Sequence, residues 1–377
     1  METISALIKD LEDKSAFKIS ANDPTLQFEN GGQNLLFATV LPERTVTENI
    51  FRQWDIQYKT MIANDATRYS PPQIKNSMLL GSVQVELAEQ DAAGAMDMQY
   101  YEHFLKTLDR GNSMEAAFQL LRFFENTVAR PLAILRERHR VDAICKGFIE
   151  RRGANNFYEM VHFPKPAGHR VTVPSGTSAV KAGWYDPNHD IVGTLKAMKK
   201  MLLKKGYRIT RIITTEEIIA ECLIPNKAIR AYGLMTVTAP GGNQGFELQT
   251  TPEAQALSSA FRAIGIPVPV TYDAGYSDQL GYHVFMKEKF VILCQTGRTQ
   301  TVRLDDSEDP LLSLPNTLGY TAIGVATGQL TPGVQYRIEA NQGKDANIYA
   351  EGWMTSFPII QDPESYAVIT VPEPTQV

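Results

Sequence analysis

The stretch NSMEAAFQLLRFFENTVARPLAILRERHRVDAICKG, residues 112–147, decides how the rest of the chain is interpreted. Its apolar residues recur at steps of three and four, which predicts one long amphipathic helix. Asn112 and Glu115 have the spacing of a capping box, and Gly147 suits the left-handed position that follows a last helical turn. Pro131 has no amide hydrogen, so we expect it to kink the helix or to divide it into two pieces.

A basic run lies near the end of this predicted helix and comprises Arg136, Arg138, His139 and Arg140. Runs of charge on a helix usually face solvent or pair with acidic side chains. The whole chain has a net charge of −5, which gives it no general attraction for nucleic acid. We therefore interpret the basic run as a solvated or salt-bridged face, and not as a nucleic-acid site.

Residues 1–50 show no apolar pattern long enough to form a core of their own. One group has helical spacing and predicts a short amphipathic helix: Ile4, Leu7, Ile8 and Leu11. The rest is interrupted by turn signals at 22–24, 30–32 and 41–42, and it predicts an extended arm. An arm that cannot bury its apolar residues within its own chain needs a neighbouring chain to cover them, so this arrangement favours assembly as the function.

Residues 78–101 alternate between apolar and polar side chains and predict a β-hairpin. Val83, Val85 and Leu87 mark the first strand, and 89–94 supply a turn. The second strand is predicted from a further alternation, that of Met96, Met98 and Tyr100. An isolated hairpin is marginally stable in water, so we expect this one to lie on another surface.

Helix and strand signals alternate over residues 180–330, which predicts a compact α/β or α+β module. Its helices are marked by residues that cap a first turn and by glycines that follow a last turn. These signals are Asn188 or Asp190 with Gly206, Thr214 with Glu217, and Thr251, Pro252 and Glu253 with Gly265. Strands are predicted over 157–163 and 169–173, which 164–168 separate, and over 208–214, 266–273, 283–294 and 366–371.

The composition is that of a globular protein. With 377 residues the chain is long enough for two or more domains, and its contents of 43% apolar and 21% charged residues are ordinary for folded proteins. The acidic N-terminus is unlike a signal peptide, and no apolar run approaches the roughly 20 residues that span a bilayer. The three cysteines, Cys145, Cys222 and Cys294, form no CxxC pair. These features predict a soluble protein made in a cytoplasm, with reduced and mostly buried thiols.

Motifs for catalysis are absent from the sequence, which has no phosphate-binding loop, nucleophile elbow or zinc-protease motif. The glycine-rich 241–245 joins two strand-like runs, so we interpret it as a mobile loop rather than as a phosphate site. The segment 186–190, DPNHD, is interpreted as a turn and helix cap rather than as a metal or acid–base site. The acidic side chains of 305–309 are interpreted as solvated, with weak cation binding as the alternative.

The six histidines show no metal-ligand spacing; they lie at 103, 139, 162, 169, 189 and 283. We therefore predict no catalytic, cofactor-binding or metal-binding residue in this chain.

Four segments, in their order, are similar to one known family. The first is NIFRQWD (49–55) with YSPPQIKNS (69–77), and the second is the long helix that ends in RERHRVDAICKG. The third is GWYDPNHDIVGTLKAMKKMLLKKGYRITRIITTEEIIAECLIPN (183–226). The fourth is VTYDAGYSDQLGYHVFMKEKFVIL (270–293), followed by FPIIQDPESYAVITV (357–371). From about Ile50 to its end, the chain resembles the major capsid proteins of tailed double-stranded-DNA bacteriophages, most nearly the lambda-type capsid protein E group with the Hong Kong 97 type fold.

This resemblance implies an α+β phage major capsid fold with five regions in chain order. They would be an N-terminal arm (1–50), an extended loop region (51–111) with the hairpin at about 78–101, a peripheral domain (112–179) with the spine helix 113–147, an α/β axial domain (180–330), and a return to the strands of the peripheral domain (331–377). The resemblance covers the first 50 residues least well, and no covalent crosslink between subunits is predicted.

The same resemblance implies a structural protein that is not an enzyme. Many copies would self-assemble into hexameric and pentameric capsomers, and these would form an icosahedral shell around packaged double-stranded DNA. The shell would belong to a virion that is assembled in the host cytoplasm. Scaffold, portal and decoration proteins would be further partners, contact with DNA would be weak and non-specific, and no membrane would be involved.

Two alternatives stay open from the sequence. The first is the shell protein of a bacterial nanocompartment, encapsulin-like and of the same fold, which encloses an enzyme in place of DNA. The second is an unrelated α/β enzyme whose site lies near Asp186, His189 and 241–245.

Overall fold

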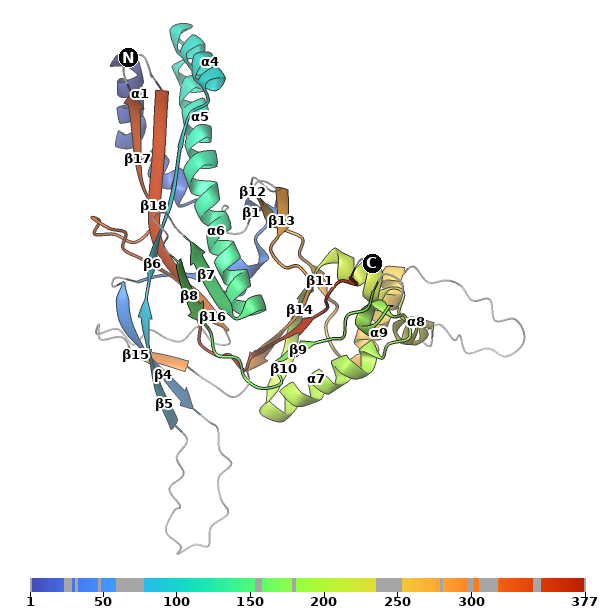
Figure 1. The fold of residues 1–377 in the computed structure, drawn as a ribbon. Helices are drawn as coiled ribbons and strands as arrows, with labels where there is room; N and C mark the ends of the chain where they lie inside the picture. The colour runs from blue at the N-terminus through green and yellow to red at the C-terminus, as the bar shows by residue number, and fades with distance from the viewer. Residues whose placement is uncertain are drawn as a thin grey trace, which may run out of the picture. The chain divides into compact units, whose positions relative to one another are not determined.

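The computed structural model describes residues 2–23, 29–30, 33–46, 49–58, 78–152, 158–177, 181–234, 253–278, 281–296, 301–304, 318–341 and 347–375. The chain divides into two compact units, which are described one at a time (Figure 1). Unit 1 comprises Met1–Gln53, Val83–Val141 and Gly319–Ile359. Unit 2 comprises Trp54–Ser82, Asp142–Leu318 and Ile360–Val377.

A long helical segment of unit 1 starts at Ser113. It consists of α5 (Ser113–Phe124), a π-helical turn (Glu125–Ala129) and α6 (Arg130–Val141). The chain then continues into a second π-helical turn (Asp142–Lys146), with which unit 2 resumes. The long helix predicted from the sequence is therefore present, and Gly147 after it has the expected left-handed backbone, with φ of +72°.

Two details of this helix differ from the prediction. A π-helical turn ends at Ala129, two residues before Pro131, where the sequence predicts a kink or a division into two pieces. In a regular α-helix the proline ring would clash with the carbonyl of Thr127, and a wider π turn relieves such a clash. The predicted capping box is wrong, because the Asn112 side chain accepts no backbone N–H and instead donates to Glu115 Oε2 at 2.5 Å.

The helix of unit 1 packs on a sheet with the strand order β17 (Gln335–Asn341), β18 (Asn347–Ile360), β16 (Gly319–Gly324) and β3 (Glu43–Thr45), and β6 (Ala88–Ala95) also pairs with β18. Strand β18 is antiparallel to β17 and β6, whereas β3 is parallel to β16. Helix and sheet share an apolar core that includes Leu120, Phe124, Val128, Leu132, Ile348, Ala350 and Met354. They approach closely at Gly352, where an added Cβ would lie 2.1 Å from Val128 Cγ1.

The N-terminal residues belong to this same core, so the predicted arm without a core is wrong for 2–23. Helices α1 (Glu2–Asp13) and α2 (Ala16–Ala21) bury one apolar face, that of Ile4, Ile8, Leu11, Phe17 and Ala21. The Phe17 ring lies 5.2 Å from that of Phe124 and 5.7 Å from that of Tyr336, measured between centroids. The helical spacing is visible in the sequence, but the surface that covers it comes from residues more than 100 positions away.

The hairpin predicted at about 78–101 is also wrong. Strand β5 (Met78–Glu86) pairs with β4 (Ile50–Tyr58), in a sheet that also contains β15 (Thr301–Leu304). Strand β6 pairs instead with β18, from Ala88 opposite Ser356 to Ala95 opposite Tyr349. The residues predicted as a turn therefore form a strand, and Met98 and Tyr100 lie in helix α4 (Met98–Asp109).

The small residues of β6 explain this error. An added Cβ at Gly94 would lie 2.8 Å from Thr127 Cγ2, so the glycine allows a close approach of strand and helix and does not form a turn.

Unit 2 is built on a five-stranded sheet with the order β11 (Val270–Thr271), β10 (Tyr207–Thr214), β14 (Lys289–Thr296), β19 (Tyr366–Thr370) and β9 (Arg170–Thr172). The three central strands are antiparallel, and both edge strands pair in parallel. Helices α7 (Ile191–Lys205), α8 (Lys227–Leu234) and α9 (Glu253–Ile264) contribute to its core. The buried Trp184 meets Phe290 edge to face, with 5.1 Å between the ring centroids.

Local signals in unit 2 are mostly confirmed. Asp190 caps α7 by accepting the Gly193 N–H at 2.7 Å. Gly206 and Gly265 follow α7 and α9 with φ of +88° and +71°. The cap predicted at Thr214 is wrong by one position, because Thr215 Oγ1 accepts the Ile218 N–H at 3.4 Å.

Two predicted strands of unit 2 are corrected. The strand predicted over 266–273 is only β11, at 270–271. The strand predicted over 283–294 is two strands, β13 (Gly281–Val284) and β14, separated by a turn in which Glu288 has φ of +58°. Strand β13 pairs with β12 (Gly275–Asp278), and β7 (Phe148–Arg152) pairs with β8 (Tyr158–His162). Thr251 and Pro252 lie outside the described residues.

The packing of α2 in the core of unit 1 predicts the effect of substitutions in this helix. We expect Phe17→Ala to lower the free energy of unfolding by about 3–5 kcal/mol, because it removes a fully buried ring. Ile19→Ala, whose side chain is 68% exposed on the same helix, should change it by less than about 0.5 kcal/mol. Urea unfolding of the full-length chain measures both, and equal effects would contradict the packing of this segment.

Candidate functional site

Four charged side chains meet inside unit 1, between helix α6 and residues 37–43, called here the N-terminal segment. Arg136, Glu137 and Arg140 lie on α6, and Glu43 lies on β3. Arg136 is 7% exposed, Arg140 1% and Glu137 0%. Burial of this many charges is costly unless each has a partner, so their contacts decide whether the cluster stabilises the fold.

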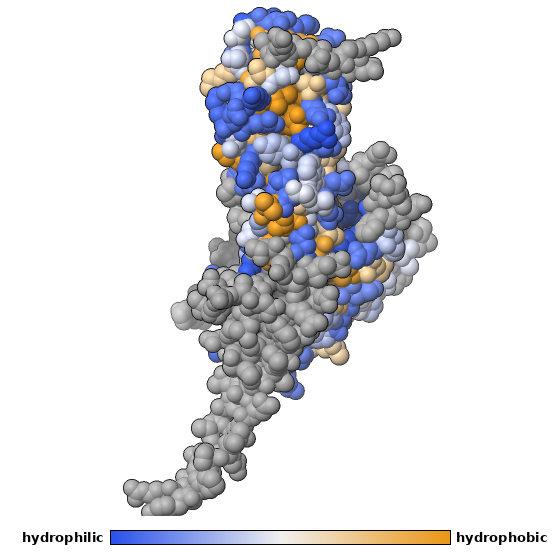
Figure 2. Space-filling view, turned by 90° about the vertical axis from the view of Figure 1, so that its left-hand side faces the viewer, coloured by the Kyte–Doolittle hydropathy of each residue, from blue (hydrophilic) through white to orange (hydrophobic). Residues whose placement is uncertain are grey.

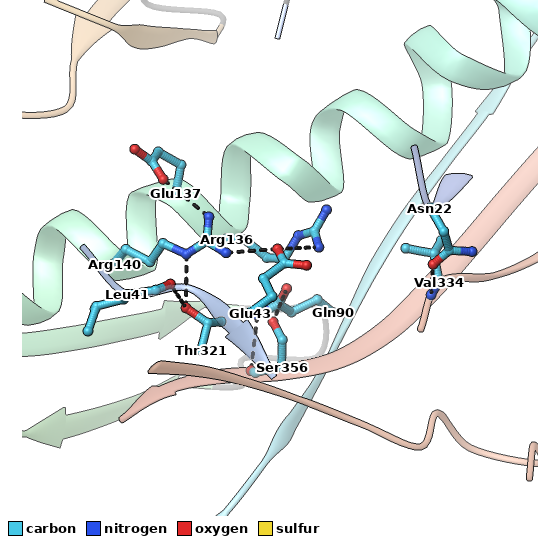
Figure 3. Close-up of polar contacts among 10 residues, drawn as sticks. All are labelled: Asn22, Leu41, Glu43, Gln90, Arg136, Glu137, Arg140, Thr321, Val334 and Ser356. Atoms are coloured by element: carbon cyan, nitrogen blue, oxygen red, sulfur yellow. Dashed lines mark hydrogen bonds and ion pairs between the residues drawn. The ribbon is translucent and has the colours of Figure 1, made fainter. Parts of the chain in front are cut away.

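Glu43 is the shared partner of the two arginines (Figure 3). Its Oε1 accepts hydrogen bonds from Arg136 Nη1 and from Arg140 Nη2, each at 2.7 Å. Arg140 Nη1 also donates to Glu137 Oε2 at 3.3 Å. With two positive and two negative charges, the cluster is formally neutral.

The cluster also binds the backbone of the N-terminal segment. Glu137 Oε1 accepts the Phe37 N–H at 2.8 Å. Arg140 Nε donates to Thr321 Oγ1 at 2.9 Å, and this hydroxyl donates to the Leu41 carbonyl at 3.0 Å. The contacts join residues 37–43, helix α6 and strand β16 into one network, and Figure 3 draws its contacts at Leu41 and Glu43.

A second buried network lies on the same helix. Gln90 Nε2 is 3.1 Å from His139 Nδ1 and donates to the Ser356 carbonyl at 3.3 Å, while Ser356 Oγ donates to Gln90 Oε1 at 3.1 Å. These side chains connect α6 with β6 and β18. They make the register of β6 on β18 specific, because a shift by one residue would turn Gln90 away from His139.

The basic run thus has a structural role, which corrects one half of its interpretation. The expected salt bridges are present, but Arg136, His139 and Arg140 are buried and not solvated. Burial lowers the pKa of Arg136, and the negative charge of Glu43 opposes this shift. A cavity of about 280 Å³ lies beside the Arg136–Glu43 pair, with Asn22, Asp23 and Met354 also in its wall.

The residues considered for chemistry do not form an assembled site in the described part of the chain. Asp186 Oδ1 accepts the Asn188 N–H at 2.9 Å in a turn, and Asp190 caps α7, as predicted. Buried His169 has both ring nitrogens bonded, to Lys205 Nζ at 2.9 Å and to the Tyr366 carbonyl at 2.8 Å. Among the described residues, no group of His, Cys, Asp and Glu could hold a metal ion. Residues 241–245 and 305–309 lie outside them.

Sequence reasoning missed the role of Glu43, the residue on which the cluster depends. It lies 93 positions before Arg136, in a segment predicted as an arm. The available signal was the basic run itself, since buried arginines require acidic partners and the three arginines of 136–140 have only Glu137 as an acid within that run.

Removal of the shared carboxylate should destabilise unit 1. We expect Glu43→Ala to lower the free energy of unfolding by about 3–5 kcal/mol, because it leaves two buried guanidinium groups without this partner. Glu339→Ala breaks an ion pair with Arg337, in which both side chains are about half exposed, and should cost less than about 1 kcal/mol. Urea unfolding compares the two, and similar losses would mean that burial adds nothing to the Glu43 pairs.

The three cysteines are buried free thiols, as predicted. Burial raises the pKa of Cys145, Cys222 and Cys294 to about 12 in each case. Since the thiolate is the reactive form, we expect no labelling by a disulfide reagent at pH 8 in the native protein and three labels per chain in guanidinium. Rapid native labelling of any of the three would show that its position is wrong.

Comparisons with known proteins bear on the fold. No protein-family model matches the sequence, and no curated protein is similar to it. A protein assigned as the capsid protein of an Escherichia coli CFT073 prophage has a similar structure, with a TM-score of 0.56 at 12% identity over 95% of this chain and 98% of that one.

Two further structures are less similar. A phage-related protein from Bordetella bronchiseptica RB50 has a TM-score of 0.48 at 12% identity, over 92% of this chain and 96% of that one. An encapsulin from Synechococcus elongatus PCC 7942 has a TM-score of 0.39 at 10% identity, over 89% and 86%. The prophage protein has a TM-score above 0.5, and its likeness extends over nearly the full length of both chains. The chain therefore has the mixed helix-and-sheet fold of phage capsid proteins, of the Hong Kong 97 type.

Proposed function

We propose that this chain is a major capsid protein whose copies form hexameric and pentameric capsomers and an icosahedral shell around packaged double-stranded DNA. The observation that carries the proposal is the likeness to the prophage capsid protein, which covers 95% of this chain and 98% of the other. The capsid role is inferred from the fold, and one fold can carry different functions. A catalytic activity of this chain would contradict the proposal.

Exposed apolar side chains support contacts between copies. On α5, Met114 and Phe118 are 69% and 61% exposed and lie one helical turn apart. On β8, Tyr158 and Met160 are 55% and 38% exposed in a two-stranded sheet, a structure that is marginal without a covering surface. Figure 2 shows, on one face, separate apolar patches within a mostly hydrophilic surface. Such patches often mark protein interfaces.

The finer assignments follow the family resemblance. We propose residues 1–50 as the N-terminal region, 51–111 as the extended loop region that contains β4 and β5, and 180–330 as the axial domain. The peripheral domain would comprise 112–179 and 331–377. We further propose a relationship to the lambda-type group, and a virion that is assembled in the host cytoplasm with scaffold, portal and decoration proteins as partners.

A structural role is also consistent with the described residues themselves. Their buried charges have structural partners, and none of their helices is long and apolar enough to cross a membrane. Ring closure requires that one surface of a subunit bind a different surface of the next, and the exposed groups on α5 in unit 1 and on β8 in unit 2 are candidates for such surfaces.

Electron microscopy and sedimentation of the purified full-length chain test the proposal. We expect closed icosahedral particles of megadalton mass that contain or package DNA. A chain that stays a 42.0 kDa monomer at high concentration would overturn it. Particles that contain one specific enzyme and no DNA would instead identify the chain as a nanocompartment shell protein.

A further inference from the structure

The cavity beside the Arg136–Glu43 pair extends from the surface of unit 1 into its interior. Asn22 in its wall is exposed, and Asp23 is half-buried. Arg136 and Met354, in the same wall, are buried. Its volume of about 280 Å³ exceeds the roughly 150 Å³ that can hold a molecule of the size of benzene. A small organic molecule therefore fits, provided that its polar groups match those of the wall.

Hydrogen bonds hold the polar wall of this cavity in place. Asn22 follows α2, and its Oδ1 accepts the Val334 N–H at 3.3 Å while its Nδ2 donates to the Lys18 carbonyl at 2.9 Å. Glu43 is fixed by the two arginines of α6 (Figure 3). The polar groups are thus positioned before a ligand arrives, which lowers the entropy cost of binding.

Arg136 brings a hydrogen-bond donor to this cavity that the cluster does not use. A guanidinium carries five N–H donors, and Arg136 donates to Glu43 through Nη1. Its buried Nε has no acceptor within the described part of the chain. In Figure 3 the guanidinium extends past Glu43 in the direction of Asn22 and Val334, which also line the cavity. Because a buried donor without an acceptor is costly, the site favours a ligand that offers an oxygen to Arg136.

Carboxylates give the same wall negative charge. Glu43 accepts from the two arginines with Oε1, so Oε2 is its acceptor for a ligand. Asp23 has another interaction and adds a second negative charge to the wall. One positive and two negative side chains therefore line the cavity. They favour a ligand that carries a positively charged donor as well as an acceptor.

We propose that this cavity binds a small zwitterion, whose carboxylate pairs with Arg136 and whose ammonium group pairs with Glu43 and lies near Asp23. A free α-amino acid with a small side chain has this chemistry. The buried cluster is formally neutral, and a zwitterion adds no net charge to it. A bare anion would add an unbalanced negative charge beside Glu43, and a simple cation would leave Arg136 Nε without an acceptor.

Such a ligand would contact three separate segments of unit 1. They are the end of α2, strand β3 and helix α6, and each supplies one charged side chain of the wall or its neighbour in sequence. Since the ligand binds only where these segments are packed together, its binding would stabilise the packing of α2 in unit 1. Binding at this site does not depend on the proposed function.

Isothermal titration calorimetry on the full-length chain tests the proposal with three probes. Glycine carries both charged groups, acetate carries the carboxylate alone, and glycinamide carries the ammonium group without a carboxylate. We expect saturable binding of glycine, with acetate and glycinamide at least about tenfold weaker, because each lacks one charge-assisted pairing.

Two results of this titration would overturn the proposal. Acetate or glycinamide that binds as tightly as glycine would show that the site takes a simple ion. Glycine that shows no saturable binding at up to about 50 mM would show that the cavity holds water only.

Three variants test whether glycine binds in this cavity. Ala21→Leu fills the cavity from its apolar wall and should abolish binding. Asp23→Asn removes a charge of the wall and should weaken binding about two- to fivefold. The matched control is Asp13→Asn on α1, which removes an exposed charge outside the cavity wall and should leave the affinity unchanged.

Circular dichroism shows whether Ala21→Leu is folded, because added volume in a packed region can disrupt it. Glycine binding that survives in folded Ala21→Leu would overturn the proposal. If this variant does not fold, the two aspartate variants decide, and equal effects of Asp23→Asn and Asp13→Asn would overturn it.

Discussion

Two arginines buried in unit 1 set the constraint on which the rest of that unit depends. Arg136 and Arg140 have lost most of their contact with water, and both use the same oxygen of Glu43 in its place. Because an unpaired buried charge is very costly, β3 can occupy only the position that presents this carboxylate. Strand β3 also pairs with β16, so the charge cluster links the N-terminal segment to the sheet as well as to the helix.

This constraint changes the picture of how the chain would assemble. The sequence suggests an N-terminal arm that folds only against a neighbour, whereas Phe17 and Ile4 are fully buried in the chain's own core. Subunits with their own cores associate as preformed bodies and pay less ordering entropy on contact. Under the proposed function, the surfaces left for association are then the exposed apolar residues, such as Phe118 and Tyr158.

Several local features were predictable from the sequence, whereas the long-range contacts were not. Asp190 and Gly206 mark the start and the end of α7. Their effects depend on residues only a few positions away, so they can be predicted from the local sequence. Glu43 meets Arg136 across 93 positions, and no periodicity reveals a pair of that kind. Gly94 shows the same limit. The composition of 89–94 suggests a turn, but the glycine lies within a strand, where the close approach of Thr127 leaves no room for a side chain. The resemblance to capsid proteins rested on the order of elements along the chain. That order is unchanged where the predicted pairing of strands is wrong.

A double-mutant cycle on Glu43 and Arg140 tests most directly whether the buried cluster fastens the N-terminal segment to the helix. Unfolding free energies of the native chain, Glu43→Gln, Arg140→Met and the double variant give the coupling energy. We expect a coupling of about 1–3 kcal/mol, as for residues that share one network. A coupling no larger than the few tenths of a kcal/mol typical of exposed pairs would contradict the account.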